Sequence, residues 1–201
     1  MFKVIKQAGG IDVIKLFKDS EAVLEGHFKL TSGYHSGVYM QCAPLLQYPE
    51  RAGILADGAI DIMGADIELE NIDTVIAPAM GGILWGYLLA QRIGCRMIFT
   101  ERKDGEMVLR RGFDIKKGEK LVIAEDVITT GGSVKEVIKI CREMGGDIKA
   151  IMVIADRNAS IDFNYPYYNM ISLDIEKYDP DDCPLCRSGI PVIYPGSRKS
   201  G

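Results

Sequence analysis

Two adjacent acids followed by a short run of hydroxyl and glycine residues form the part of this chain best suited to chemistry. Glu125 and Asp126 follow an apolar stretch, and the run TTGGS (residues 129–133) comes shortly afterwards. Small residues let backbone N–H groups crowd around a phosphate, and hydroxyl groups add hydrogen bonds. Carboxylates repel a phosphate, so we expect them to face either the hydroxyls of a sugar or a bound Mg²⁺. The segment 125–133 is therefore predicted to hold a sugar phosphate.

The flanking pattern predicts that this turn joins a buried strand to an amphipathic helix. Leu121–Ala124 is a short apolar run, and apolar residues recur between Val134 and Met144 with the spacing of one helix face. Ser133 followed by Glu136 has the pattern of a capping box, which places the start of the helix. Open α/β sheets bind ligands at the carboxyl ends of their parallel strands, where this turn is expected to lie.

Further apolar runs alternate with helical segments, as in βαβ units that build a parallel sheet. The expected strands lie at 72–78, 97–100, 121–124, 150–155 and 171–175. The expected helices lie at 11–17, from Pro49 toward Met63, after Gly81-Gly82 as far as Ile93, and at 134–144. A strand pair is expected between Phe28 and Leu46. A polar hairpin with an Asp104-Gly105 turn is expected between Glu101 and Phe113. Residues 158–169 are expected to form a loop. We predict one α/β domain with an N-terminal appendage.

The overall composition limits the classes of function. A chain of 201 residues has room for one sizeable core, and its net charge of −4 argues against a general nucleic-acid or membrane-surface binder. No stretch approaches the roughly 18 apolar residues of a membrane helix. Lys3 and Lys6 interrupt the first ten residues, so we expect no secretory signal. The odd number of cysteines, five in all, argues against a disulfide framework, and we expect a cytoplasmic, reduced protein.

Competing nucleotide motifs fit poorly. The glycines at 81 and 86 have the spacing of a P-loop, but Tyr87 stands where that loop needs lysine. A Gly-Gly pair at a helix start is often only backbone geometry, and the preceding acids are what favour a binding turn here. Arg157, just after a predicted strand, is either a surface arginine or a cation that pairs with a planar carboxylate.

Two other groups of residues have open interpretations. Four cations around the predicted hairpin could bind a polyanion or form a solvated surface: Arg102, Lys103, Arg110 and Arg111. His27 and His35 are expected to be surface or packing residues. Cys183 and Cys186 have the CxxC spacing of a redox pair or of half a zinc site. A structural zinc needs four ligands and no second such pair is present, so a packed turn is favoured, although two subunits could share a metal.

The stretch EDVITTGGS (125–133) closely resembles the signature with which type I phosphoribosyltransferases bind 5-phosphoribosyl-1-diphosphate (PRPP). Other segments resemble the orotate branch of that family, in the same order along the chain: LTSGYHSGVYMQ (30–41), APAMGGI (77–83), FTERKDG (99–105) and ADR (155–157). The ending DCPLCRSGIPV resembles a short form of this branch. The resemblance covers residues from about 20 to 195.

This resemblance implies the type I phosphoribosyltransferase fold, a central parallel sheet flanked by helices with an N-terminal hood and a β-hairpin flap. The whole chain, 1–201, would be one domain, with an N-terminal helix and hood at about 1–48, the flap at 100–114 and a tail at 179–201. The implied reaction joins PRPP and orotate into orotidine 5′-monophosphate and diphosphate, in pyrimidine biosynthesis. The implied cofactor is Mg²⁺, held mainly through PRPP rather than by side chains. A homodimer is implied, with each flap reaching the neighbouring site.

The roles of individual residues follow from the same resemblance. The residues expected to contact PRPP are Arg102, Lys103, Glu125, Asp126, Val127, Ile128, Thr129, Thr130, Gly131, Gly132 and Ser133. The residues expected to contact orotate are Thr31, Ser32, Gly33, Thr129 and Arg157. Arg102, Lys103 and Asp126 are the expected catalytic residues.

The chain departs from the longer pattern of the family at two places. That pattern has a further lysine and a histidine in the flap, where this chain has Glu106–Leu109, and a lysine where Gly81 stands. Arg110 and Arg111 could supply the missing charge. Two alternatives stay open: a regulator that binds PRPP without catalysis, and a redox or zinc protein centred on Cys183 and Cys186.

Overall fold

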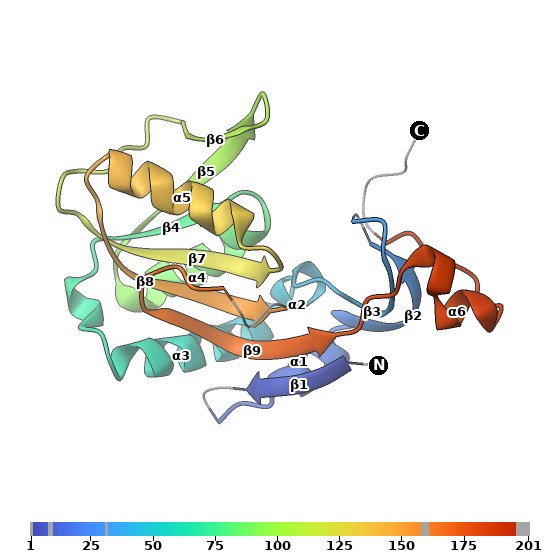
Figure 1. The fold of residues 1–201 in the computed structure, drawn as a ribbon. Helices are drawn as coiled ribbons and strands as arrows, with labels where there is room; N and C mark the ends of the chain where they lie inside the picture. The colour runs from blue at the N-terminus through green and yellow to red at the C-terminus, as the bar shows by residue number, and fades with distance from the viewer. Residues whose placement is uncertain (1, 8–9, 31, 158–160, 196–201) are drawn as a thin grey trace.

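Alternating strands and helices build a seven-stranded sheet in the computed structural model, which describes residues 2–7, 10–30, 32–157 and 161–195 (Figure 1). The strands, in their order across the sheet, are β1 (Phe2–Gln7), β9 (Tyr167–Ile175), β8 (Asp147–Asp156), β7 (Lys120–Ile128), β4 (Thr74–Pro78), β5 (Arg96–Lys103) and β6 (Glu106–Leu109). The five inner strands are parallel, and β1 and β6 run antiparallel at the two edges. The predicted parallel sheet is confirmed.

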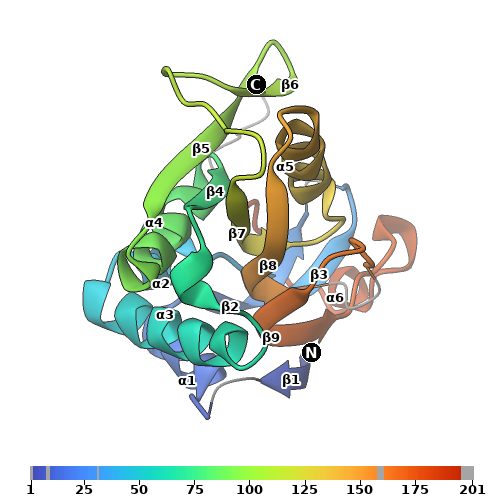
Figure 2. The same ribbon diagram turned by 90° about the vertical axis from the view of Figure 1, so that its left-hand side faces the viewer.

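Helices cover both faces of this sheet, so its inner strands are apolar on both sides (Figure 2). The first face carries α1 (Val13–Asp19), α3 (Pro49–Gly64) and α4 (Gly81–Ile93), and the other carries α5 (Gly132–Glu143). Side chains of β7 alternate between the two cores. Val122 packs with the cluster under α3 and α4, whereas Leu121 and Ile123 pack with the cluster under α5. The continuous apolar runs in the sequence are the result.

Local signals place α3 and α4 correctly. Pro49 is the first residue of α3, a position where its missing N–H costs nothing. Gly94 ends α4 in the left-handed conformation at φ 82°. Trp85 of α4 is fully buried and donates its indole N–H to the Met152 carbonyl at 3.2 Å, which anchors the helix on β8. None of the helices in the described part of the chain combines the length and apolar character needed to span a bilayer.

A second, two-stranded sheet stands beyond the carboxyl ends of β7, β8 and β9 (Figure 1). We call it the hood hairpin; it consists of β2 (Val23–Lys29) and β3 (His35–Met40) in antiparallel pairing. Residues 176–195, here called the C-terminal segment, follow β9 and lie against both edges of this hairpin. His35 and Tyr178 exchange backbone hydrogen bonds of 2.8 and 2.9 Å, and Ile193 donates its N–H to the His27 carbonyl at 2.7 Å.

The polar hairpin is also present, but its first strand is longer than expected. β5 runs without a break from Arg96 to Lys103, because it pairs with β4 over its first half and with β6 over its second. Asp104 and Gly105 have φ values of 53° and 90°, as a type I′ turn requires. This hairpin projects from the edge of the sheet (Figure 2).

Several boundaries differ from the predictions. The hood hairpin begins at Val23, and Ala43–Leu46 is a short helix, α2, because Pro44 suits a first helical turn. β9 begins at Tyr167, within the expected loop, where it pairs with β8. β1 was not expected, since its strand character comes from pairing with β9. Three further short helices lie in the described part of the chain: η1 (Leu69–Asn71), η2 (Pro180–Asp182) and α6 (Pro184–Arg187).

The predicted capping box is wrong. The N-cap of α5 is Gly131, in the left-handed conformation at φ 71°, and no side chain caps the helix. Ser133 therefore lies inside the first turn instead of before it. Glu136 is engaged elsewhere, because its carboxylate binds the guanidinium of Arg102 on the flap.

Candidate active site at the carboxyl ends of the strands

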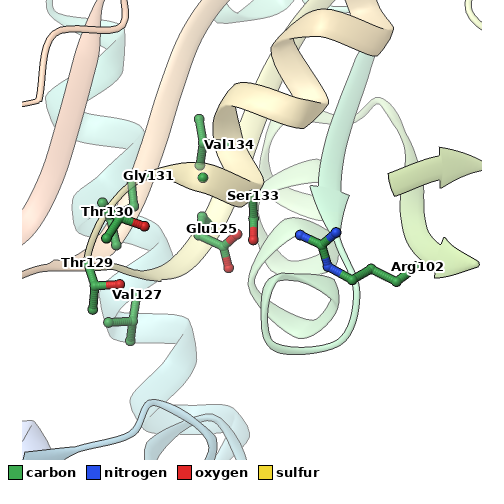
Figure 3. Close-up of a pocket in the computed structure, with 10 residues that line it drawn as sticks. Arg102, Glu125, Val127, Thr129, Thr130, Gly131, Ser133 and Val134 are labelled. Carbon is green, nitrogen blue, oxygen red and sulfur yellow. The ribbon is translucent and has the colours of Figure 1, made fainter. Parts of the chain in front are cut away.

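A small cavity of about 250 Å³ lies where β7 ends and α5 begins (Figure 3). The turn between these elements wraps around it, and its lining residues are Arg102, Glu125, Val127, Ile128, Thr129, Thr130, Gly131, Gly132, Ser133 and Val134. The first N–H groups of α5 have no partner within the helix, so they and the helix dipole favour an anion here. Gly131 is required at its position, because an added Cβ would stand 2.9 Å from the Phe163 ring as well as in a strained conformation.

The two acids lie beside this anion site without placing two full charges in it. Glu125 is buried, and burial together with the neighbouring Asp126 raises the pKa of its carboxyl to about 9. A protonated Glu125 can donate a hydrogen bond to a ligand oxygen at neutral pH. Asp126 is half-buried, and its carboxylate accepts a hydrogen bond from the Val127 N–H at 2.9 Å. The two side chains can thus form hydrogen bonds with two neighbouring hydroxyl groups of a sugar.

Gly81, at the start of α4, makes a close approach to the second acid. A Cβ built on Gly81 would stand 2.4 Å from Oδ2 of Asp126. Any side chain at this position would have to displace the carboxylate, so glycine keeps the acid in its place. The first turn of α4 therefore packs directly against the second acid.

A second cavity, of about 530 Å³, lies between the turn and the hood hairpin. Its lining residues are Lys29, Leu30, Ser32, Tyr39, Met40, Thr129, Thr130, Arg157, Lys177 and Pro195. Thr129 and Thr130 line both cavities, so one turn serves both. The backbone N–H of Arg157 donates to the Ile128 carbonyl at 2.9 Å, which fixes the end of β8 beside the end of β7.

Arg157 is the residue of the second cavity whose side chain is best suited to bind a ligand. Its Nε is buried and has no hydrogen-bond partner among the described residues. Burial lowers the pKa of the guanidinium, although an arginine stays protonated under all ordinary conditions. A planar, partly unsatisfied guanidinium fits a carboxylate, which it can bind through two parallel hydrogen bonds.

A third cavity, of about 420 Å³, adjoins the first through Arg102 and lies under the flap. The flap arginines are paired with acids in this arrangement. Arg102 binds Glu136 at 2.5 Å, and Glu101 binds Arg111 at 2.9 Å and Arg110 at 3.2 Å. The guanidinium groups of all three arginines stay about half exposed, although the Glu101 carboxylate is mostly buried. Solvent can therefore reach the cations, and an anion of higher charge can compete with the carboxylates.

The structure brings most of the predicted site residues together, with four exceptions. Lys103 is exposed on the flap and is not among the described residues that line these three cavities. Asp126 is not among the residues that line the first cavity, although it neighbours Glu125, which is. Gly33 lies beside Ser32 at the tip of the hood hairpin without lining the second cavity, and Thr31 lies outside the described residues.

Three polar residues of the second cavity were missed: Lys29, Tyr39 and Lys177. Lys177 had a recognisable signal, because it follows β9 as the binding turn follows β7, at the carboxyl end of a parallel strand. Lys29 ends β2 at the tip of the hood hairpin, whereas Tyr39 lies near the other end of β3, opposite Leu24. Only the folding of that hairpin over the sheet directs both side chains to the cavity.

Comparisons with known proteins agree with this geometry. A family model described as Phosphoribosyl transferase domain matches residues 50–185. A protein of Caldicellulosiruptor bescii named orotate phosphoribosyltransferase is 49% identical over 187 residues, which cover 92% of this chain and 96% of that protein. A protein of Carboxydothermus hydrogenoformans with the same name is 44% identical over 190 residues, 94% of this chain and 98% of that one.

Solved structures extend the comparison to the fold. The orotate phosphoribosyltransferase of Aeropyrum pernix is 26% identical and superimposes with a TM-score of 0.63, covering 90% of this chain and 91% of that one. An adenine phosphoribosyltransferase of Trypanosoma brucei, 14% identical, has a TM-score of 0.62 and covers 85% of this chain and 87% of its own. At that identity the likeness shows the fold alone.

The raised pKa of Glu125 makes stability depend on pH. In the unfolded chain this carboxyl loses its proton near its usual value of 4.5, whereas in the folded protein it keeps the proton up to about 9. Between these values the folded protein binds more protons, so its stability falls as pH rises. Glu125→Gln cannot ionise, and we expect it to be more stable than the parent at pH 8 by at least about 1 kcal/mol, or roughly 2–4 °C. The difference should shrink toward pH 5.

Thermal unfolding of the substrate-free protein between pH 5 and pH 8.5 measures this effect. Glu143→Gln, which changes an exposed acid at the end of α5, is the matched control and should follow the parent at every pH. A stability difference for Glu125→Gln that stays constant with pH would show that the carboxyl is not held protonated.

Proposed function

The chain belongs to the phosphoribosyltransferase family and to its orotate branch, and we propose that it forms orotidine 5′-monophosphate and diphosphate from orotate and PRPP with the help of Mg²⁺. The observation that carries the proposal is the turn between β7 and α5, which lines an anion cavity on one side and the cavity of Arg157 on the other. A phosphorylated sugar and a carboxylated base can therefore meet over Thr129 and Thr130.

The residues of the two cavities suit the two substrates. The N–H groups of the turn and of α5 hold the 5′-phosphate, and Glu125 and Asp126 bind the ribose hydroxyls. In the second cavity Arg157 pairs with the carboxylate of orotate. Ser32, at the tip of the hood hairpin, lines the same cavity, where its polar groups can bind the amide edge of the pyrimidine ring.

The reaction is a substitution at the anomeric carbon. The bond from this carbon to the diphosphate oxygen breaks with its electron pair on the oxygen, and the N1 lone pair of orotate forms the new bond. The proton of N1 passes to solvent or to the departing diphosphate, so a dedicated general base is not needed. Arg102, Arg110 and Arg111 stabilise the departing diphosphate once they exchange Glu136 and Glu101 for it.

The site also suits the proposed Mg²⁺. Hard cations prefer oxygen ligands, and the carboxylates of Glu125 and Asp126 stand beside the anion cavity. Because Glu125 keeps its proton at neutral pH in the free protein, the oxygens of PRPP are the main ligands in this proposal. Bound Mg²⁺ would neutralise charge that grows on the diphosphate as it leaves.

We further propose that the protein works in the cytoplasm as a homodimer in which each flap reaches the neighbouring site. Lys103 is exposed and does not line the three cavities described above, and the flap projects from the sheet edge (Figure 2). Met80, Leu84 and Tyr87 form an exposed apolar stripe on the first turns of α4, with exposed fractions of 83%, 54% and 62%. Such a stripe favours burial against another protein surface. The five cysteines are all free, as in a reducing compartment.

A second candidate function is a regulator that binds PRPP without turnover. It is favoured by the ion pairs that occupy the flap arginines and by Gly81, where the longer family pattern has lysine. The two functions share the binding turn and differ only in whether diphosphate is released.

Turnover of orotate distinguishes these functions. Purified protein with PRPP and Mg²⁺ should consume orotate, followed as the loss of its ultraviolet absorbance, and removal of Mg²⁺ with a chelator should abolish the reaction. Turnover of uracil or a purine in place of orotate would contradict the substrate. PRPP binding without diphosphate release for any base would favour the regulator.

Asp126→Asn should lower kcat/KM by roughly tenfold or more, because the amide binds the ribose hydroxyls less well as charge develops on the sugar. The fold should persist, since the side chain is only half-buried, the amide has the same shape, and its oxygen can still accept from the Val127 N–H. Asp61→Asn, on the exposed side of α3, is the control and should keep the parental rate. An unchanged rate for Asp126→Asn would contradict a role of this carboxylate in the reaction.

Arg157→Gln should raise the KM for orotate by roughly 10- to 100-fold, the effect of losing a hydrogen bond to a charged group. The KM for PRPP should change far less, because Arg157 lines only the second cavity. Steady-state kinetics with each substrate varied in turn measure the split. Arg142→Gln, at the exposed end of α5, is the control. Equal effects on both substrates would contradict a role in base recognition.

A further inference from the structure

Both histidines of the chain and two of its cysteines meet at one point outside the three cavities. His27 lies in β2 and His35 begins β3, whereas Cys183 and Cys186 belong to the first turn of α6 in the C-terminal segment. One nitrogen or sulfur atom from each residue lies within 4.8 Å of all the others. Three of the four side chains are buried, and Cys186 is exposed.

The spacing of these atoms matches a tetrahedral metal site. With zinc bonds of about 2.0–2.1 Å to nitrogen and 2.3 Å to sulfur, tetrahedral angles put nitrogen and sulfur about 3.6 Å apart and two nitrogens about 3.3 Å apart. His27 Nε2 lies 3.6 Å from Cys183 Sγ and 3.7 Å from Cys186 Sγ, and His35 Nδ1 lies 3.4 Å from Cys186 Sγ. The two nitrogens are 2.9 Å apart, slightly closer than in a loaded site.

The hydrogen bond at the other side of the His27 ring fixes its tautomer. His27 Nδ1 lies 2.7 Å from the Ile190 carbonyl, which can only accept, so Nδ1 carries the proton. The Nε2 atom of the neutral ring then offers one lone pair, and three groups converge on it: His35 Nδ1, Cys183 Sγ and Cys186 Sγ. One lone pair cannot serve three donors. A cation between the four atoms would accept a lone pair from each, and the Ile190 carbonyl would orient the ring from behind.

The ligand types identify the class of metal. Two imidazoles and two thiolates form the Cys₂His₂ set of structural zinc sites, with the two cysteines in the usual CxxC spacing. All four positions of the tetrahedron are filled by side chains, so no position stays open for a substrate. Binding would release the two thiol protons to water.

We propose that His27, His35, Cys183 and Cys186 bind one Zn²⁺ per chain and thereby tie the C-terminal segment to the hood hairpin. The backbone bonds of His35 to Tyr178 and of His27 to Ile193 already join the same two parts on either side of the cluster. The tip of this hairpin carries Leu30 and Ser32 on the wall of the second cavity. Zinc would therefore hold that wall in place without touching the ligand.

Metal analysis of the purified protein tests the site directly. After dialysis against metal-free buffer we expect one zinc per chain by mass spectrometry, and loss of that zinc in Cys183→Ser/Cys186→Ser. Cys95→Ser, which changes a half-buried cysteine outside the cluster, is the matched control and should keep the metal. Replacement of zinc by Co²⁺ should produce the intense visible bands of a tetrahedral site with thiolate ligands.

Removal of the metal should also have a physical effect on the whole protein. We expect the stripped protein to unfold at least roughly 5 °C below the zinc form and to recover when Zn²⁺ is added back. If the double variant fails to fold, the metal content of the parent protein and its response to added Zn²⁺ still test the proposal. No stoichiometric metal together with no response of unfolding to added Zn²⁺ would overturn the proposal, as would a Cys183–Cys186 disulfide found by thiol titration.

The metal measurement does not depend on catalysis. Bound zinc in a protein that fails to turn over orotate would support the zinc site and contradict the proposed function. Orotate turnover by a protein without bound zinc would support the proposed function and overturn the zinc site. A higher KM for orotate in stripped protein, with the KM for PRPP little changed, is expected only if both proposals hold.

Discussion

An anion site and a pair of acids share the end of one strand, and the rest of the structure depends on keeping their charges apart. The helix dipole and free N–H groups of α5 attract a phosphate, while carboxylates one turn away repel it. Burial resolves the conflict for Glu125, whose raised pKa leaves it neutral. Asp126 is held to the side by the backbone of Val127 and by the close approach of Gly81. The loop before α4 and the turn before α5 therefore have to be positioned together, which only a rigid parallel sheet achieves.

The parts that could be predicted from the sequence are those whose signals are local. The apolar run of β7, the acids and the TTGGS turn follow one another without interruption, so both their structure and their place at the strand end were evident. The same holds for Pro49, for Gly94 and for the Asp104-Gly105 turn. Each of these residues fixes a backbone conformation by its own chemistry.

The parts that could not be predicted depend on contacts between distant residues. Ser133 and Glu136 have the pattern of a capping box, yet a flap arginine more than thirty positions away binds Glu136. His27 and Cys183 are 156 positions apart, and neither has a metal-site pattern with the other until the C-terminal segment folds back on the hood hairpin. The CxxC alone was ambiguous because half of the ligand set was hidden in a strand pair. A pattern search along the chain misses ligands that only tertiary structure assembles.

Like charges also lie close together in the flap, where ion pairs, instead of burial, reduce the repulsion between them. Three arginines close together would repel one another and any approach to the sheet edge, and pairing with Glu101 and Glu136 removes that cost in the free protein. The arginines of these pairs stay about half exposed, so in the proposed reaction a diphosphate with several charges can compete with Glu101 and Glu136 for them. Because Glu136 belongs to α5, release of Arg102 frees an acid on the helix whose first turn faces the phosphate. In the proposed reaction, binding at the turn and movement of the flap are then linked through Glu136, and α5 is the element that connects them.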